Sequence, residues 1–261
     1  NKKNYKSLKD MMKSYTSYYI LRKKNPSIFT KEKFVSKEID DFFEINSIKK
    51  KIALVHIKEK IGNAVIKPTD PKTYLKTLDY LNKNNFQLIF CGREQMPEIF
   101  NNYDIINYTT WNKVSFENDL ALVAKSSFVM SYASGFSNMP DIMNIPNIYI
   151  GSWHLPLSLS SNKTIFLPIL LNDNDKKAIK FIDQIKIYLE TEHESVFKKI
   201  PNPNFEYPNG DDILNATIIA LGNNKTNIKD VYQKKFKNLH GNIPLNFSSV
   251  RIPDEYLIKN K

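Results

Sequence analysis

The pattern of apolar and polar positions changes at about Lys51, where short apolar runs begin to alternate with amphipathic stretches. The apolar runs are bounded by turn-forming residues, which is typical of buried strands. They lie at residues 52–55, 87–90, 104–108, 128–130, 147–150 and 164–167. Helical spacing of apolar residues is seen at residues 74–81, 116–123, 179–189 and 213–221. Alternating strands and helices predict an α/β fold, a Rossmann-like parallel sheet with helices on both faces.

Residues 1–50 differ from the rest because they are helical in pattern and basic. One helical stretch ends at Asn25-Pro26, and a second runs from Thr30 to about Phe43. They predict a small helical N-terminal segment ahead of the sheet. It is either a hairpin that packs on the main domain or a piece of a second domain or of a membrane-facing surface.

The Rossmann-like domain is predicted to span residues 51–222. Three prolines within residues 200–208 indicate a linker or a wrapping loop there. Residues 223–261 predict a basic helix, at 228–240, followed by a tail.

Composition narrows the classes of partner. The chain has 261 residues, a net charge of +11 and no apolar run long enough to cross a membrane. The positive charge favours anionic partners, namely nucleotide phosphates, an anionic membrane surface or nucleic acid. Cys91 is the single cysteine, which excludes an intrachain disulfide and a cysteine-rich metal site.

Candidate chemistry gathers at the carboxyl ends of three predicted strands, where open parallel sheets bind ligands. Lys58 and Arg93 follow the first two strands and supply positive charge. The turn Ser134-Gly-Phe-Ser137 follows the strand at 128–130 and offers hydroxyl and backbone donors. Together these groups suit a diphosphate. The alternatives are solvated surface charges and an ordinary turn capped by serine.

Other motifs of known enzymes are absent, or have a structural explanation in place of or beside a chemical one. The chain contains no P-loop, no GxGxxG fingerprint and no G-x-S-x-G elbow. Asp173-Asn-Asp175 has a form that can bind a divalent metal, but it precedes a predicted helix and is read as a cap, so no metal site is predicted. Trp153 and His154 are adjacent and form either a structural pair or a loop-borne pair for sugar stacking or catalysis.

Five segments resemble a family of bacterial glycosyltransferases from surface-polysaccharide gene clusters. Leu54-Val-His-Ile-Lys58 resembles its "LHVR" strand end, and the region 124–150 is similar to its "A..FFLGTSSGLSFVP..FGVPCV" stretch. The other segments are 87–92, similar to a strand that ends in Gly, 104–108, which resembles "VIDY", and 252–260, which resembles "ISPSFLRKN". The likeness covers residues 51–261 in collinear order.

The resemblance implies the donor-binding half of a two-Rossmann-domain (GT-B) glycosyltransferase, with residues 51–222 as the nucleotide-sugar-binding domain. Residues 1–50 would then be a remnant of the acceptor domain or a reduced form of it. The strand end and the late serine turn also resemble fucosyltransferase-like enzymes, in which Arg neutralises the nucleotide diphosphate. Lys58 stands at that Arg position here, and Ala133 replaces the first Ser of the family's pair.

The sequence therefore predicts a metal-independent glycosyltransferase without a cofactor, in which a nucleotide sugar is the substrate. The expected general base is Glu59 or His154. The expected donor-phosphate ligands are Lys58, Arg93, Ser134, Gly135 and Ser137. The rest of the donor pocket is expected to be His56, Gly92, Asn138 and Trp153.

The acceptor is expected to be a glycan or a lipid-linked glycan, in the cytoplasm or at the inner face of the membrane, with the basic helices as membrane contacts. No specific nucleic acid is expected. The alternative is a non-catalytic subunit that binds a nucleotide or a polyanion in a glycan-assembly or nucleic-acid complex.

Overall fold

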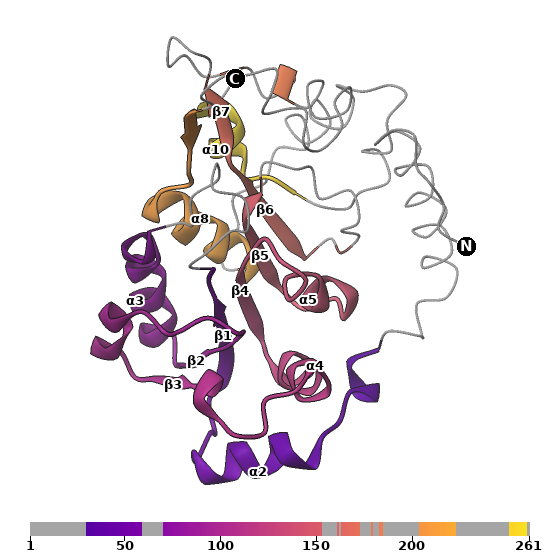
Figure 1. The fold of residues 1–261 in the computed structure, drawn as a ribbon. Helices are drawn as coiled ribbons and strands as arrows, with labels where there is room; N and C mark the ends of the chain where they lie inside the picture. The colour runs from indigo at the N-terminus through magenta and orange to yellow at the C-terminus, as the bar shows by residue number, and fades with distance from the viewer. Residues whose placement is uncertain are drawn as a thin grey trace.

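The computed structural model of the chain describes residues 30–58, 70–152, 161, 163–172, 179, 183–184, 204–222 and 251–259. Six parallel strands form one sheet in the spatial order β3-β2-β1-β4-β5-β6 (Figure 1). The strands are β1 (Lys51–His56), β2 (Phe86–Phe90), β3 (Ile105–Asn107), β4 (Phe128–Tyr132), β5 (Asn147–Ser152) and β6 (Thr164–Pro168). The predicted α/β fold, a Rossmann-like parallel sheet, is confirmed.

Helices cover both faces of this sheet. One face packs against α3 (Leu75–Lys83) and α8 (Gly210–Ala220), and the other packs against α2 (Lys37–Ile45), α4 (Phe116–Lys125) and α5 (Asn138–Ile142) (Figure 1). The shorter helices are η2 (Lys31–Lys33), η3 (Pro71–Tyr74), η4 (Glu98–Asn102), η5 (Tyr108–Thr110) and α10 (Asp254–Lys259). None of the helices in the described ranges is both long and apolar enough to span a lipid bilayer.

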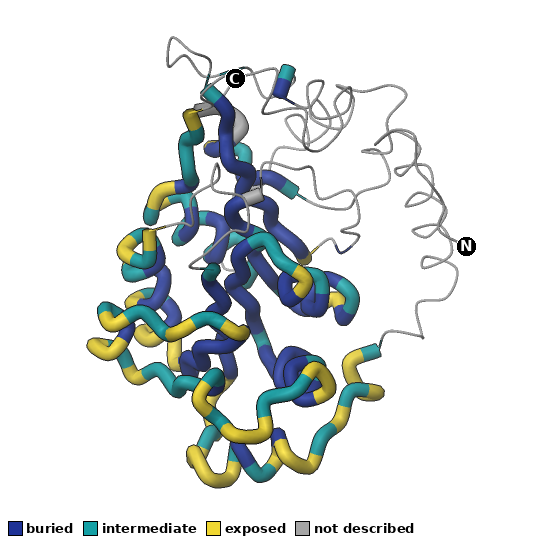
Figure 2. The backbone as a smooth tube through the Cα atoms, viewed as in Figure 1, coloured by how far each residue is buried: buried dark blue, intermediate teal, exposed yellow. Residues whose placement is uncertain are grey.

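Strand β1 shows why the apolar runs are continuous rather than alternating. Ala53 and Val55 belong to the core on the α3 face, whereas Ile52 and Leu54 belong to the core on the α4 face. Side chains alternate between the faces of a strand, so a strand covered on both sides needs apolar residues at every position. Figure 2 shows the result as a buried central sheet inside more exposed helices and loops.

Described residues on either side of the predicted Rossmann-like domain share its core. Ile39 and Phe42 of α2 are buried on the α4 face, and the Phe42 ring meets the Tyr108 ring edge-on at 5.4 Å between centroids. At the other end, Ile252 is fully buried, and the Tyr256 hydroxyl donates to the Pro168 carbonyl at 2.7 Å. These packing contacts tie residues from both flanks to the sheet.

Two elements differ from the sequence prediction. The helix expected from Thr30 is interrupted: η2 ends at Lys33, and the α-helix α2 begins at Lys37, where the Ser36 side chain accepts a hydrogen bond from the Ile39 N–H and caps it. Part of the expected loop at 200–208 is a strand, β8 (Asn204–Glu206), which pairs antiparallel with β7 (Leu170–Asn172). Strands of three residues are too short to show a periodic pattern.

Most of the helix expected at 179–189 and all of that at 228–240 lie outside the described residues.

Candidate functional site

The strand order has a switch point between β1 and β4, which lie side by side. From β1 the chain continues through α3 toward β2, and from β4 it continues through α5 to β5 on the opposite side. Loops that leave such neighbouring strands in opposite directions open a crevice at the carboxyl edge of the sheet, where ligands bind in open α/β folds. The loops that carry Lys58 and Ser134 flank this point, and the loop that carries Arg93 follows β2, next to β1.

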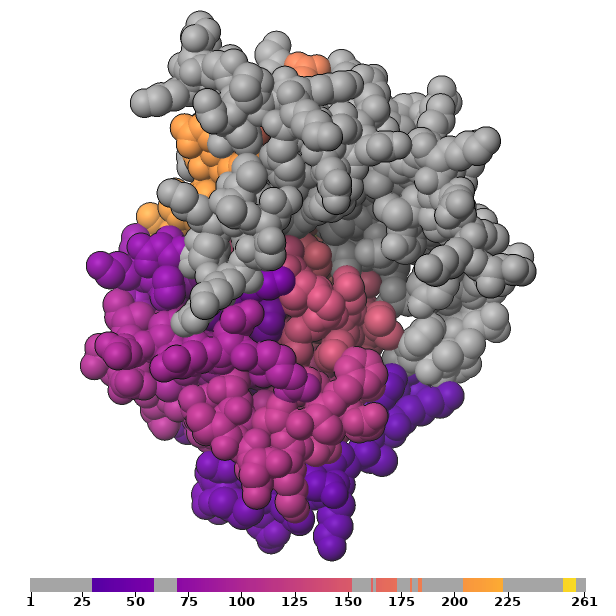
Figure 3. Space-filling model, viewed as in Figure 1, coloured from indigo at the N-terminus to yellow at the C-terminus, as the bar shows by residue number. Residues whose placement is uncertain are grey.

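The His56 ring joins the three loops. It stacks on the Phe136 ring, with 4.9 Å between centroids and 13° between planes. It also packs against Gly92, where a Cβ atom would lie 2.6 Å from His56 Cδ2. Gly92 also has a φ of +112°, which side chains other than glycine rarely adopt. We call His56, Gly92 and Phe136 the loop junction. Figure 3 shows atoms of segments 30–58, 70–125 and 128–152 meeting on one face of the molecule.

Burial decides the charge state of His56. The side chain is 5% exposed, and loss of solvation together with the nearby Lys58 charge lowers its pKa to about 4, although a backbone partner at Tyr132 opposes the shift. His56 is therefore neutral near pH 7. Its Nδ1 atom has no hydrogen-bond partner among the described residues. The structure gives His56 a packing role in the junction, and its contact with a ligand stays a prediction.

The serine turn uses most of its donors internally. The Ser134 N–H donates to Ser137 Oγ at 2.9 Å, the Ser137 hydroxyl donates to the Ser134 carbonyl at 2.6 Å, and the Phe136 N–H donates to Ser134 Oγ at 3.1 Å. Ser137 is completely buried, whereas Gly135 is exposed at the tip of the turn. Asn138 is half-buried and begins α5, a helix of five residues. The hydroxyls stabilise the turn, and the exposed backbone at Gly135 is its accessible part.

Lys58 and Arg93 have different surroundings. Lys58 is half-buried and has no ion pair within the described ranges. Arg93 Nη2 lies 3.1 Å from Asp119 Oδ2 on α4; the Arg93 side chain is 57% exposed and that of Asp119 only 7%. Burial raises the pKa of Asp119, and the Arg93 cation opposes this rise. One of the two cations expected at a diphosphate is thus already paired with a buried carboxylate.

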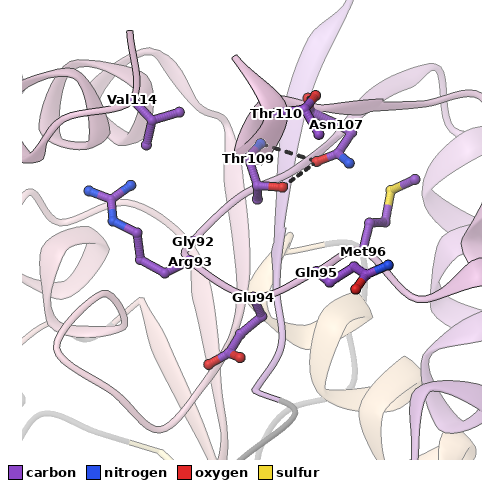
Figure 4. Close-up of a pocket in the computed structure, with 9 residues that line it drawn as sticks. All are labelled: Gly92, Arg93, Glu94, Gln95, Met96, Asn107, Thr109, Thr110 and Val114. Carbon is purple, nitrogen blue, oxygen red and sulfur yellow. Dashed lines mark hydrogen bonds between the residues drawn. The ribbon is translucent and has the colours of Figure 1, made fainter. Parts of the chain in front are cut away.

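A pocket of about 560 Å³ opens beside Arg93, beyond the ends of β2 and β3 (Figure 4). Its lining contains two residues that the sequence predicted, Gly92 and Arg93. The lining residues that sequence reasoning missed are Glu94, Gln95, Met96, Asn107, Thr109, Thr110 and Val114. Lys58 and the serine turn are not part of this lining. The same strand-end rule, applied to the strand expected at 104–108, would have pointed to Thr109 and Thr110.

The structure thus brings together the loops of the predicted site residues, but only some of the side chains themselves. The junction links the loops of Lys58, Arg93 and Ser134, while the Arg93 side chain extends to Asp119 and to the pocket. Glu59, Trp153 and His154, which include both candidate bases, lie outside the described residues.

The fold and the strand-end loops define a Rossmann-like α/β protein with a candidate ligand site at the switch point of its sheet. Comparison of the chain with protein-family models gives no match, and comparison with curated proteins gives none either.

Proposed function

We propose that the chain is a glycosyltransferase that moves a sugar from a nucleotide-sugar donor to a surface-glycan acceptor. The observation that carries the proposal is the loop junction, because it links the strand-end loops whose residues resemble the glycosyltransferase family. The site lies where open α/β sheets bind their ligands. The described part of the chain is proposed to bind the donor.

In this reaction an acceptor hydroxyl oxygen attacks the anomeric carbon, and the bond from that carbon to the donor's diphosphate oxygen breaks. The leaving nucleoside diphosphate gains negative charge, which cations stabilise most strongly where water is excluded. Lys58 and Arg93 are proposed to supply this stabilisation, and the exposed backbone at Gly135 allows a phosphate to come close. The acceptor proton is proposed to pass to Glu59, with His154 as the second candidate.

Thermal unfolding in the presence of a panel of nucleotide sugars tests the donor site. A ligand that binds only the folded state raises the unfolding temperature, so one donor should give a selective rise. Lys58→Ala should weaken binding of that donor about tenfold or more, because it removes a charge-assisted contact to phosphate. Lys51→Ala is the matched control: Lys51 is exposed at the opposite end of β1, and its loss should change donor affinity less than about twofold.

Two results would contradict the proposal. One is a Lys58→Ala variant that keeps the wild-type affinity for the donor. The other is the absence of a shift with every nucleotide sugar, combined with salt-sensitive binding to anionic vesicles or RNA, which would favour the non-catalytic subunit.

A further inference from the structure

The pocket beside Arg93 has the size of a small-molecule site and a mostly polar lining, which includes the Glu94 carboxylate. Its volume of about 560 Å³ lies within the usual range for ligand pockets, roughly 300–1,000 Å³. Arg93 supplies a positive charge, Asn107 and Thr109 supply uncharged polar groups, and Met96 and Val114 supply apolar surface. Such a lining suits a polar molecule with one charged group better than an apolar one.

Arg93 can bind an anion without leaving Asp119. A guanidinium has five N–H donors in a fixed fork, and Asp119 is its only partner in the described part of the chain. The carboxylate is buried and the guanidinium is more than half exposed, so the pair has one anchored side and one open side. Glu94, the next residue, points its carboxylate away from the Arg93 guanidinium (Figure 4). The open side of Arg93 therefore remains positive.

Asn107 provides an oriented donor in the same pocket. Its Oδ1 atom accepts hydrogen bonds from the Thr109 N–H at 3.1 Å and from the Thr109 hydroxyl at 2.7 Å. These two bonds fix the amide plane, and the Asn107 Nδ2 group has no hydrogen-bond partner among the described residues. In Figure 4 this nitrogen lies on the side away from Thr109 and from the Arg93 guanidinium, toward Met96, so a ligand that contacts both residues has to extend across the pocket. A hydroxyl or ring oxygen of a ligand can accept from it.

We propose that this pocket binds a sugar unit that carries one oxyanion group, either a phosphate attached to the sugar or a carboxylate. The oxyanion lies on Arg93, a sugar oxygen accepts from Asn107, and Asp119 acts as the positioning residue that holds the guanidinium at the pocket. The inference rests on the proposed function only for the choice of a sugar. The negative charge on the ligand can have two sources: the phosphate attached to the sugar of a donor, or the carboxylate of an acidic sugar in an acceptor.

The experiment is a titration of the full chain with glucose 1-phosphate, glucuronate and glucose, followed by calorimetry or by NMR. At least one charged sugar should bind about tenfold or more tightly than glucose, because a charge-assisted contact to Arg93 is added. Preference for glucose 1-phosphate identifies a phosphate, and preference for glucuronate identifies a carboxylate. The double variant Arg93→Gln/Asp119→Asn, which removes both charges and leaves no unpaired buried carboxylate, should lose this preference. Arg251→Gln, the matched control in the other described arginine, should keep it.

A second measurement does not depend on any variant being folded. The chain has three arginines, so the side-chain Nε resonance of Arg93 can be assigned and followed in the wild-type protein. It should shift with the charged sugars and not with glucose, while the Arg22 and Arg251 resonances stay in place. Equal binding of the three sugars, a preference that survives in the folded double variant, or an unchanged Arg93 resonance overturns the proposal.

The test of the pocket can fail while the proposed function holds, and the proposed function can fail while the pocket assignment holds. Donor binding that depends on Lys58, without any preference for charged sugars, overturns only the pocket assignment. A preference for charged sugars without a response to any nucleotide sugar overturns only the donor assignment.

Discussion

The loop junction and the Arg93 pocket lie at the same edge of the sheet, yet they are built in opposite ways. In the junction, His56, Gly92 and Phe136 pack without room for an extra carbon, and the histidine is buried and neutral. In the pocket, two strand ends leave about 560 Å³ open. It is lined by the exposed Arg93 guanidinium and by the Asn107 amide, whose nitrogen has no hydrogen-bond partner among the described residues. Gly92 belongs to both regions, since its backbone lines the pocket and its missing side chain admits His56.

Polar residues at strand ends therefore have two different roles in this protein: some pack the loops together, and others present an exposed group to a ligand. In the sequence, His56, Arg93 and Ser137 all look like ligand-binding groups after buried strands. In the structure, His56 and Ser137 are buried and hold loops together, and Arg93 is the one of these three with an exposed charged group. We therefore expect changes in the junction to act on stability, and changes at Arg93 in the pocket to reduce binding and, through Asp119, to reduce stability to a smaller extent.

Gly92→Ala should give the largest loss of stability. The added Cβ would lie 2.6 Å from His56 Cδ2, and alanine would have to adopt a φ of +112°. Backbone strain and overpacking together should cost about 2–4 kcal/mol in the free energy of unfolding, measured by denaturant titration. Gly135→Ala is the control: a Cβ there has no atom within 4 Å, so the change should stay below about 0.5 kcal/mol. Equal losses in the two variants would show that the junction is not tightly packed.

The pH dependence of stability should show the burial of His56. Its pKa is about 4 in the folded protein and 6.5 in an exposed histidine, so between these values the unfolded chain takes up a proton that the folded chain does not. Stability is therefore lost as pH falls from 6.5 to 4, by up to about 3 kcal/mol. His56→Phe keeps an aromatic ring and removes the titration. The free energy of unfolding of this variant should fall less over the same pH range, and an equal fall in both proteins would contradict the burial.

Arg93→Ala should have a smaller effect, because most of the Arg93 side chain is exposed. It leaves the Asp119 carboxylate buried without its cation, which should cost about 1–3 kcal/mol at pH 7. The pKa of Asp119 is already raised by burial and should rise further without Arg93, so the loss should shrink as acid protonates the carboxyl. Asp119→Asn in the same chain should recover most of the stability. No recovery would mean that Arg93 acts through packing rather than charge.

The sheet was predictable from the sequence because its strands are covered on both faces. A run such as Ile52-Ala-Leu-Val55 has no polar position, and a continuous apolar run of this length between turn signals is typical of a buried parallel strand. The helices α3, α4 and α8 were predictable from the spacing of their apolar residues, whereas α10 falls in the part of the chain that was expected to be a tail. Elements of three residues, such as β7 and β8, were not, because they are formed by a tertiary partner rather than by a local pattern.

The candidate site was predictable only in part, for a physical reason. Chain order places Lys58, Arg93 and Ser134 after buried strands, and the parallel sheet then brings their loops to one edge. The direction of each side chain depends on residues far away in the sequence. Asp119 holds Arg93, and nothing in the local sequence of either residue indicates this contact. The same holds for the stacking of His56 on Phe136.

The contact between Arg251 and β6 has a consequence for how the protein behaves in concentrated solution. The Phe166 N–H donates to the Arg251 carbonyl at 2.8 Å, and the Arg251 N–H donates to the Thr164 carbonyl at 3.3 Å. These bonds occupy backbone groups on the outer side of the last strand, which would otherwise be a template for pairing with another chain. The strand at the far border, β3, has only three residues and offers a short template. The backbone of Arg251 thus helps protect the edge of the sheet from pairing with another chain.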